Sequence, residues 1–302
     1  MHVYSKGERW FDVVNYTLLA TLAFVCFYPF VMMTVLSINA GTDSMRGGIT
    51  FWPRVFTLVN YRVILENAAI QRAYIITVLR TVVGTASGVF VTALVAYGLA
   101  ERRLPGRKYI MIYMVVPMFF SGGLIPYFLQ LRDLRLINTF WVYVIPLLFN
   151  IWNCIVMKTF FQEIPVSLKE SARLDGANEL TVLFRIVFPV SKPLFAAISL
   201  FVAVGHWNDW FAGAFFVTRQ HLRPVQTYLM GIMTADLSDS FNQQTVQAAQ
   251  QLMGRFITDY STITSLSLRM AAVMIAVIPI LLVYPFLQKY FVKGVLIGSL
   301  KG

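Results

Sequence analysis

Long apolar segments, separated by shorter polar ones, run through the whole chain. Segments long enough to cross the hydrocarbon core of a bilayer lie at about 13–38, 73–100, 109–131, 139–157, 193–218 and 262–288. Six such spans predict an all-α polytopic membrane protein whose two termini lie on the same side. The first segment is too long for the apolar core of a cleaved signal peptide and contains Pro29, so we interpret it as a retained span.

The composition agrees with this prediction. Of the 302 residues, 58% are hydrophobic and only 13% are charged. So few polar side chains cannot cover a soluble domain of this size, which excludes that class of protein.

The basic residues predict which side is cytoplasmic. One face carries the larger set of Lys and Arg in its loops and termini, namely Lys6, Arg9, Arg102, Arg103, Arg107, Lys108, Lys158, Lys169, Arg173, Arg185, Lys192, Lys289, Lys293 and Lys301. Because basic loops stay in the cytoplasm, we expect both termini inside. The formal net charge of +11 then reflects topology and contact with anionic membrane lipids, and we expect no nucleic-acid partner.

A polar, turn-rich loop at 162–192 lies between two of the apolar segments. Ser167 followed by Glu170 has the spacing of a capping box, so we expect a short helix to begin at Leu168. Gly176 is placed to end that helix with a positive φ. The first half of the loop is therefore predicted to be one short, capped helix.

The second half of the loop predicts another short helix. It is expected over about 177–187 and is stopped by Pro189. Two short helices joined by a tight turn would form a compact knob. Apolar Ala172, Leu174 and Ala177 near that turn have no evident core to enter.

The same loop carries a motif. Glu170-Ser171-Ala172, Asp175-Gly176-Ala177 and Ile186-Val187-Phe188-Pro189 resemble, in order and spacing, the EAA motif of ABC importer permeases, the cytoplasmic loop that docks on the ATPase subunit. Ser171 replaces the usual Ala and Phe188 the usual Leu. An ordinary amphipathic connector would account for the capping pattern but not for the full spacing. The resemblance assigns ATPase coupling to Glu170, Ser171, Ala172, Leu174, Asp175, Gly176 and Ala177. We call residues 162–192 the EAA-like loop.

Patterns for catalysis are missing from the sequence. The chain has no Gly-x-x-x-x-Gly-Lys-Ser/Thr phosphate loop, and His2, His206 and His221 are scattered without metal-site spacing. Cys26 and Cys154 lie in apolar spans, where reduced packing residues are expected. We therefore predict no enzymatic activity, no metal and no cofactor in this chain. The resemblance implies that ATP and Mg²⁺ are bound by a partner ATPase.

Three charged residues lie inside predicted spans, where a charge is costly and tends to face a cavity or a partner. Arg269 is near the outer end of the sixth span and is interpreted as an interface anchor, which leaves Arg80 and Asp209. At 1.5 Å per residue from the outer ends, Arg80 lies about seven residues deep and Asp209 about nine. They could pair with each other, line an outward-facing vestibule, or extend to the interface.

Asp209 belongs to an aromatic and polar cluster, His206-Trp207-Asn208-Asp209-Trp210. Aromatic rings beside hydrogen-bonding groups suit a sugar, because an apolar sugar face stacks while its hydroxyls take hydrogen bonds. An aromatic belt at the outer interface would use the same residue types. The candidates for the substrate pathway are Arg80, Trp207, Asn208, Asp209 and Trp210.

A wider resemblance covers about residues 10–302. The pair Trp207-Asn208 is similar to the maltose-type, carbohydrate-uptake branch of ABC permeases. Further stretches resemble the subset of that branch that takes complex oligosaccharides with a lipoprotein receptor, namely Phe51-Trp52-Pro53 ahead of Asn60-Tyr61, Arg103 to Lys108, Phe120 to Pro126, and Gln288 to Gly294. Gly122-Gly123 and Pro126 are expected to break the third span, which is tolerated where freed backbone faces protein or water.

This resemblance implies a MetI-like type I importer permease fold in the bacterial plasma membrane. It implies a cytoplasmic N-terminus at 1–12, a first helix and outer loop at 13–72, a five-helix core at 73–290, a cytoplasmic tail at 291–302, and an outer loop at 219–261 as the candidate contact for a binding protein. The implied partners are a second homologous permease, two ATPase subunits, an extracellular solute-binding lipoprotein and a sugar. The chain would form half of the pathway.

Two other functions fit parts of the sequence. An ion-coupled secondary transporter would need a carboxylate near the middle of the membrane, and Asp209, the only carboxylate inside any predicted span, lies too far out. An ABC permease for a non-sugar solute would share the EAA-like loop, because one polar cluster does not specify a ligand. The sequence favours a permease subunit for sugar import.

Overall fold

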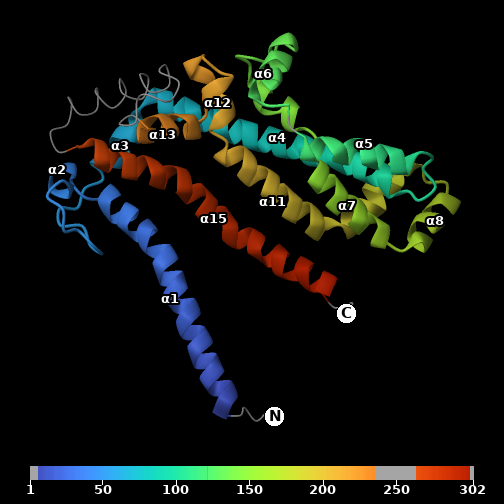
Figure 1. The fold of residues 1–302 in the computed structure, drawn as a ribbon, viewed down its shortest axis with the longest axis horizontal. Helices are drawn as coiled ribbons and strands as arrows, with labels where there is room; N and C mark the ends of the chain where they lie inside the picture. Colours follow the sequence, from blue (N-terminus) through green and yellow to red (C-terminus); the bar gives the residue numbers. More distant parts are fainter. Residues whose placement is uncertain (1–5, 121, 235–262, 300–302) are drawn as a thin grey trace. The chain divides into compact units, whose positions relative to one another are not determined.

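The computed structural model describes residues 6–120, 122–234 and 263–299. Over these ranges the chain is helical, and β structure is limited to one isolated bridge between Asn39 and Phe56 (Figure 1). The prediction of an all-α chain is confirmed. The described residues divide into two compact units, 6–67 with 263–277 and 68–234 with 278–299. The helix α15 (Ser265–Ser299) contributes to both.

The first unit starts with α1 (Lys6–Ser37), an apolar helix whose side chains are exposed within the unit over most of its length. Short helices α2 (Gly41–Ser44) and α3 (Val59–Glu66) follow. Polar contacts hold the segment between α2 and α3. Asn39 Nδ2 donates to Asp43 Oδ2 at 3.1 Å, and Arg54 Nε lies 3.1 Å from the same oxygen. The loop that follows α1 is therefore an ordered, hydrogen-bonded structure.

The second unit is organised around α4 (Ala68–Ala100). Its buried positions recur every three or four residues and are mostly small, namely Ala73, Thr77, Gly84, Gly88, Thr92 and Ala96. Small residues let helix backbones approach closely in a membrane. The helices α7 (Ile151–Glu163) and α11 (Lys192–Asn208) pack against this face. The helix α4 is therefore the common support of the second unit.

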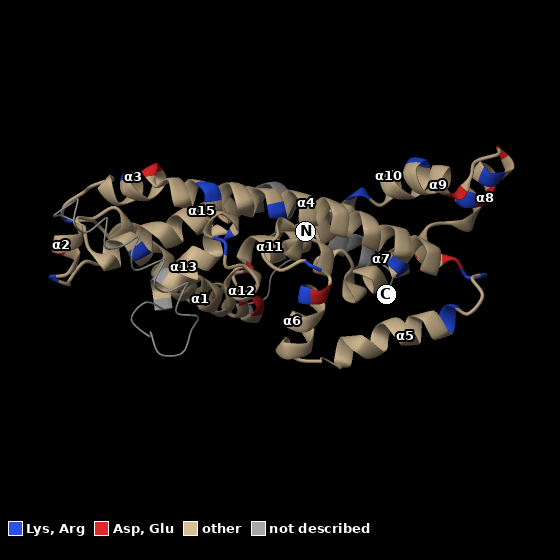
Figure 2. Cartoon of the chain, turned by 90° about the horizontal axis from the view of Figure 1, so that it is seen from above, with Lys and Arg blue, Asp and Glu red and all other residues tan. Residues whose placement is uncertain are grey.

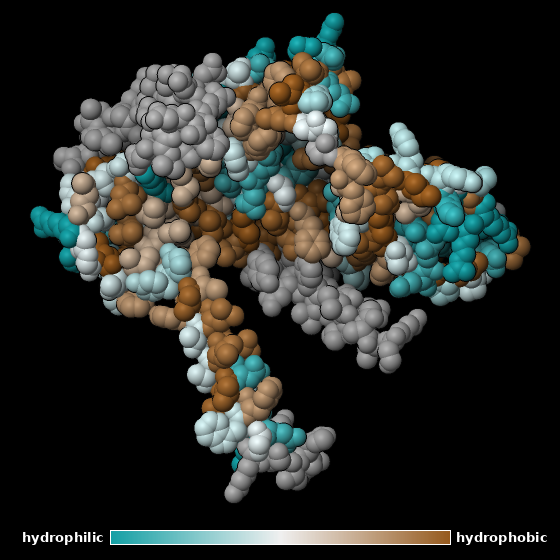
Figure 3. Space-filling model, viewed as in Figure 1, coloured by the Kyte–Doolittle hydropathy of each residue, from teal (hydrophilic) through white to brown (hydrophobic). Residues whose placement is uncertain are grey.

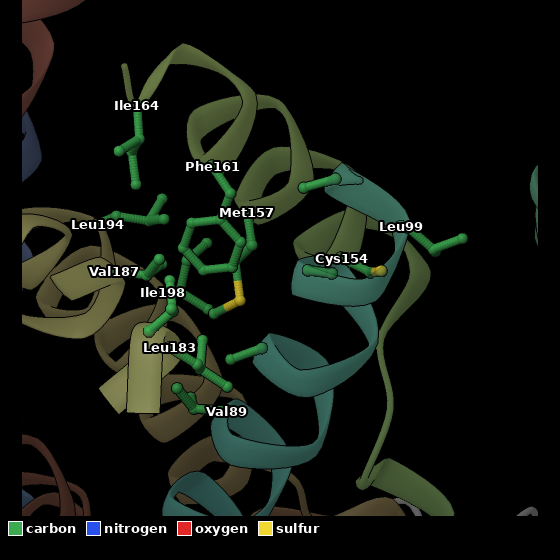
Figure 4. Close-up of a cluster of buried hydrophobic side chains, with 14 residues drawn as sticks. Val89, Leu99, Cys154, Met157, Phe161, Ile164, Leu183, Val187, Leu194 and Ile198 are labelled. Carbon is green, nitrogen blue, oxygen red and sulfur yellow. The ribbon is translucent and has the colours of Figure 1, made fainter. Parts of the chain in front are cut away.

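Two apolar clusters fill this unit. The larger one joins α4, α7, α11 and the π-helical turn η3 (Leu183–Val187), with Met157 and Phe161 fully buried at its centre (Figure 4). The smaller one surrounds Tyr143 and Phe216. Because η3 belongs to the EAA-like loop, part of that loop is built into the core.

Several spans are broken. The helices α5 (Arg107–Phe119) and α6 (Leu124–Asp133) are separated at Gly122-Gly123, and Gly123 has a φ of +84°, so the predicted break of the third span is confirmed. Pro126 itself lies in the first turn of α6, where its missing N–H costs no helical hydrogen bond. Pro126 contributes to the break, because its ring prevents a regular helix from running through Gly122 into this turn, and Gly123 supplies the positive φ.

The fourth and fifth spans are also interrupted. The 3₁₀ turns η1 (Phe140–Tyr143) and η2 (Ile145–Leu147) precede α7, which is bent from them by 46°. After α11 the chain continues as α12 (Phe211–Phe215), η4 (Gln220–Leu222) and α13 (Val225–Thr234).

The number of spans agrees with the prediction. Among the described residues, three helices are long and apolar enough to cross a membrane, and three bent helix pairs raise the number to as many as six. The predicted outer loop at 219–261 is described only as far as 234, so the rest of that prediction lies outside the described residues. The predicted tail at 291–302 is helical up to Ser299.

Candidate functional site

The EAA-like loop folds into four short helical pieces. They are α8 (Val166–Leu174), α9 (Glu179–Val182), η3 and α10 (Phe188–Val190). Charged side chains gather around α8 and α9, and hydrophilic surface covers this end of the second unit (Figures 2 and 3). The prediction of two short helices therefore holds in outline, but their limits differ.

The prediction of a capping box at Ser167 and Glu170 is wrong. The whole loop is described, and in it α8 begins at Val166 with Pro165 as its N-cap and no side-chain cap hydrogen bond. Ser167 consequently lies within the first turn of the helix. Pro165 explains the shift, because its ring fixes φ near the helical value and the chain enters the helix earlier than the capping pattern predicts. Glu170 is exposed on α8 and is available to a partner.

The turn after α8 confirms the prediction for Gly176. This residue has a φ of +83°, Ala177 N–H donates to Ala172 C=O at 2.9 Å, and Gly176 N–H donates to Arg173 C=O at 3.1 Å. These two bonds form a Schellman motif, which satisfies the last carbonyl groups of α8. The sequence signal, a glycine just after an expected helix, was sufficient here.

The apolar residues near the turn divide into two groups. Ala172 and Ala177 are half-buried and pack against the larger cluster, so the expectation that they have no core to enter is wrong. Leu174, in contrast, is 89% exposed. Ser171 and Asp175 are also exposed. The loop therefore has an inner side attached to the core and an outer side that is free for a partner.

The second helix differs most from its prediction. It begins at Glu179 and not at 177, because Asn178 caps it by accepting a hydrogen bond from Thr181 N–H at 2.8 Å. The backbone remains helical through η3 and α10, and Pro189 lies in the first turn of α10. Helical structure is interrupted at Ser191, so the predicted stop at Pro189 is wrong. Pro189 directly follows the π-helical turn η3, where the regular α-helical hydrogen-bond ladder is already changed, and the helical backbone accommodates the proline there.

A charged cluster, which the sequence reasoning missed, ties the loop to α4. Arg173 Nε lies 2.8 Å from Glu179 Oε1, and Arg173 Nη2 lies 3.3 Å from Glu101 Oε2. The hydroxyl of Tyr97 donates to Glu179 Oε2 at 2.7 Å. Hydrogen bonding from Arg173 lowers the pKa of Glu179, and the N–H of Arg103 is the main cause of a lowered pKa of Glu101. We call Tyr97, Glu101, Arg173 and Glu179 the Arg173 cluster.

In the first half of α4 the structure brings Arg80 together with Asp209. Arg80 is fully buried, and its Nη1 lies 3.4 Å from Asp209 Oδ2. Arg80 Nη2 donates to the carbonyl groups of Trp207, at 3.4 Å, and of Asp209. Its guanidinium lies 5.2 Å from the centre of the Tyr143 ring. The predicted pair is present, and the alternative in which Arg80 extends to the interface is excluded by its burial.

The pair lies where α11 ends. A helix end leaves carbonyl groups without helical partners, and inside a membrane these groups need internal donors. Arg80 supplies them, while Asp209 Oδ1 accepts from Ala212 N–H at 3.2 Å in the first turn of α12. Arg80 and Asp209 together therefore stabilise the interruption between α11 and α12.

The other pathway candidates lie around the same interruption. Asn208 is exposed, Trp207 and Trp210 are half-buried, and the Asp209 side chain is 24% exposed. Phe201, Gly205 and Asn208 are all exposed, and their spacing places them on one face of α11. Arg80 does not reach this face, because its side chain is buried behind the chain break.

Two further polar side chains, His206 and Thr77, lie near Arg80. The sequence reasoning placed His206 in the aromatic and polar cluster but not among the pathway candidates, and it missed Thr77. A Cβ on Gly84 would lie 2.4 Å from the His206 ring, so the imidazole needs a glycine there. Thr77 Oγ1 accepts from Val225 N–H at 2.9 Å. The spacing of Thr77, Arg80 and Gly84 on one helical face was the available signal.

Comparisons with known proteins place this geometry in context. The family model described as "Binding-protein-dependent transport system inner membrane component" matches residues 84–297. In Bacillus subtilis (strain 168), the polygalacturonan/rhamnogalacturonan transport system permease protein YtcP is 37% identical over 98% of this chain and 99% of its own length. Protein LplC of the same strain is 35% identical over 99% of this chain and 97% of its own length.

Among solved structures, one similar chain comes from a bacterial ABC transporter involved in the import of the acidic polysaccharide alginate. It matches with a TM-score of 0.84 and 28% identity, and the match covers 96% of this chain and 100% of that chain.

Proposed function

The chain belongs to the family of binding-protein-dependent transport system inner membrane components, and we propose that it is the permease subunit of an ATP-driven importer of oligosaccharides. In this proposal a second, homologous permease supplies the other half of the pathway. Two ATPase subunits bind ATP and Mg²⁺ beneath the membrane, and an extracellular solute-binding lipoprotein delivers the sugar. The ion-coupled carrier is set aside, because this family depends on a binding protein.

The observation that carries the proposal is the two-sided EAA-like loop. Its inner side is anchored in the core, and apolar side chains are exposed over the loop, namely Val166, Leu168, Leu174, Leu180 and Phe184. Exposed apolar groups gathered on an ordered loop favour a protein partner. The acidic Glu170 and Asp175, also exposed, would give that contact its polar rim. We assign this surface to the ATPase.

The exposed face of α11 is the proposed pathway surface. Asn208 and the exposed part of Asp209 would offer hydrogen bonds, and the neighbouring Trp207 and Trp210 would offer rings for stacking. Arg80 would act from behind by holding the segment in place. Two similar proteins are named for polygalacturonan/rhamnogalacturonan transport and alginate import. Fragments of acidic polysaccharides are therefore the first substrates to test.

Reconstitution with the matching partners tests the function. The complex is purified without crosslinking, placed in vesicles with its binding protein, and supplied with labelled oligogalacturonides, alginate fragments or neutral oligosaccharides. We expect a nucleotide-binding subunit in stoichiometric amount and uptake that requires both ATP and the binding protein. Reproducible absence of an ATPase from the complex contradicts the proposal, and uptake of none of these sugars contradicts the substrate class.

The variant Asp209→Asn tests the pathway surface. It keeps a side-chain oxygen for Ala212 N–H, and Arg80 keeps its two carbonyl partners, so assembly and basal ATP hydrolysis should be retained. Loss of the carboxylate charge should change the rate or the selectivity of uptake. Uptake that is unchanged for every sugar in the panel would remove Asp209 from the pathway.

A further inference from the structure

The helix α8 carries the most exposed side chain of the proposed docking surface, and few contacts hold it to the rest of the second unit. The pieces that follow it are firmly seated, because Val182, Leu183 and Val187 are buried in the larger cluster. Apolar contact from α8 itself comes through the half-buried Ala172. The orientation of α8 therefore depends heavily on polar contacts.

Two basic residues of α8 make these contacts. Lys169 Nζ donates to the carbonyl of Phe161 in α7 at 3.1 Å, and Arg173 reaches Glu101 beside the end of α4 and Glu179 in α9. Arg173 thus connects α8 both to the end of α4 and to α9. A planar guanidinium can serve two carboxylates at once, which the single ammonium group of a lysine does less well.

A cavity makes the polar contacts more important. About 460 Å³ of space lies between α8, α9 and the end of α4, with Leu94, Gly98 and Leu180 in its lining alongside the Arg173 cluster. Apolar side chains do not fill this space, so they cannot transmit a movement of α8 across it. The Arg173 cluster spans the edge of the cavity and can transmit a movement of α8 to α4.

The helix α4 also carries Arg80, which contacts Asp209 among the proposed pathway residues. Glu101 and Arg80 are 21 positions apart, which corresponds to about 30 Å along a helix. In the first half of the helix, Arg80 binds the interruption between α11 and α12. One rigid element therefore connects the EAA-like loop to the segment that bears the pathway candidates.

We propose that Arg173 is a positioning residue for transport, which carries movement of α8 into α4 by holding Glu101 and Glu179 together. The inference rests on the proposed function, since it assumes that an ATPase moves α8. The cluster is partly exposed, with side-chain exposures of 36%, 43% and 57% for Arg173, Glu101 and Glu179. Such ion pairs contribute little to folding, so their removal should affect coupling without unfolding the chain.

The test compares Arg173→Gln with Arg102→Gln, which removes one positive charge near the same end of α4. Each complex, with its ATPases and binding protein, is reconstituted and assayed for basal and binding-protein-stimulated ATP hydrolysis and for uptake. For Arg173→Gln we expect normal ATPase content and basal hydrolysis, with stimulation and uptake reduced about fivefold or more, as for typical coupling between sites. Arg102→Gln should behave as wild type.

A second variant separates transmission from docking. Glu101 lies at the end of α4 and not on α8, so Glu101→Gln should reproduce the coupling defect although it leaves the docking helix unchanged. The double variant should be no worse than Arg173→Gln alone, because the Arg173–Glu101 ion pair that Glu101→Gln removes is already broken by Arg173→Gln. Additive defects, loss of ATPase from the Arg173→Gln complex, or wild-type stimulation in Arg173→Gln would each overturn the inference. Failure of the wild-type complex to bind an ATPase would instead contradict the proposed function.

Discussion

Replacing Gly176 by valine should uncouple the EAA-like loop without unfolding the protein. Gly176 has a φ of +83°, and apart from its two chain neighbours no described atom lies within 4 Å of the position that a Cβ would take. The penalty is therefore backbone strain and not a clash, and a left-handed conformation in a β-branched residue costs about 1–3 kcal/mol.

The strain would be relieved at the expense of the turn. If the backbone leaves the left-handed region, the hydrogen bonds from Gly176 and Ala177 N–H to α8 are lost, each contributing about 0.5–1.5 kcal/mol. Either outcome is small beside a domain stability of about 5–15 kcal/mol, so the chain should insert and assemble. It is large enough to displace Leu174 and the docking surface around it.

The assay is binding-protein-stimulated ATP hydrolysis in reconstituted vesicles, normalised to the ATPase content of each preparation. Gly176→Asn is the matched control, because asparagine adopts the left-handed conformation more readily than other non-glycine residues. We expect normal assembly for both variants, with stimulation lost in Gly176→Val and largely kept in Gly176→Asn. Wild-type stimulation in Gly176→Val would refute the reasoning and leave the loop as a mere connector.

Three further changes test the packing around the two sites. Arg80→Met leaves the partly exposed carboxylate of Asp209 and two carbonyl groups without their donor, which should lower stability by about 1–3 kcal/mol, seen as a lower melting temperature of the purified complex; a melting temperature equal to wild type would contradict a stabilising role of the pair. Gly84→Val places carbon atoms against the buried imidazole and should cost at least about 1–3 kcal/mol. Gly98→Val, where no described atom outside the neighbouring turns of the helix lies within 4 Å of a Cβ, should be nearly neutral in the same melting assay. Equal effects of the two glycine variants would argue against the close approach. Asn178→Ala removes the N-cap of α9 and should cost about 0.5–2 kcal/mol, measured by faster protease cleavage within the loop; cleavage at the wild-type rate would show that the cap contributes nothing.

The sequence was sufficient to predict features that depend on local residue type, such as apolar spans and turns that need a glycine. A bilayer requires long apolar helices, so the apolar segments predicted the spans before any packing was known. Only glycine adopts a positive φ without strain, so Gly176 and the Gly122-Gly123 pair predicted a turn and a break that the structure contains. The first and last residues of helices were less predictable where two local sequence signals compete. Pro165 overrode the capping pattern at Ser167.

Tertiary structure decided the contacts that give these elements a function. Arg80 and Asp209 are 129 positions apart, and the sequence left open whether they pair, line a vestibule or reach the interface. Arg173 and Glu101 are 72 positions apart on different segments. Neither distance is encoded by a helical or strand period. Both pairs depend on the packing of α7 and α11 against the small residues of α4, which brings Asp209 to Arg80 in the first half of α4 and Arg173 to Glu101 just after its last residue. The sequence by itself determined the spans and turns, because those depend on backbone and solvent alone, and the packing of α4 decided which charges meet.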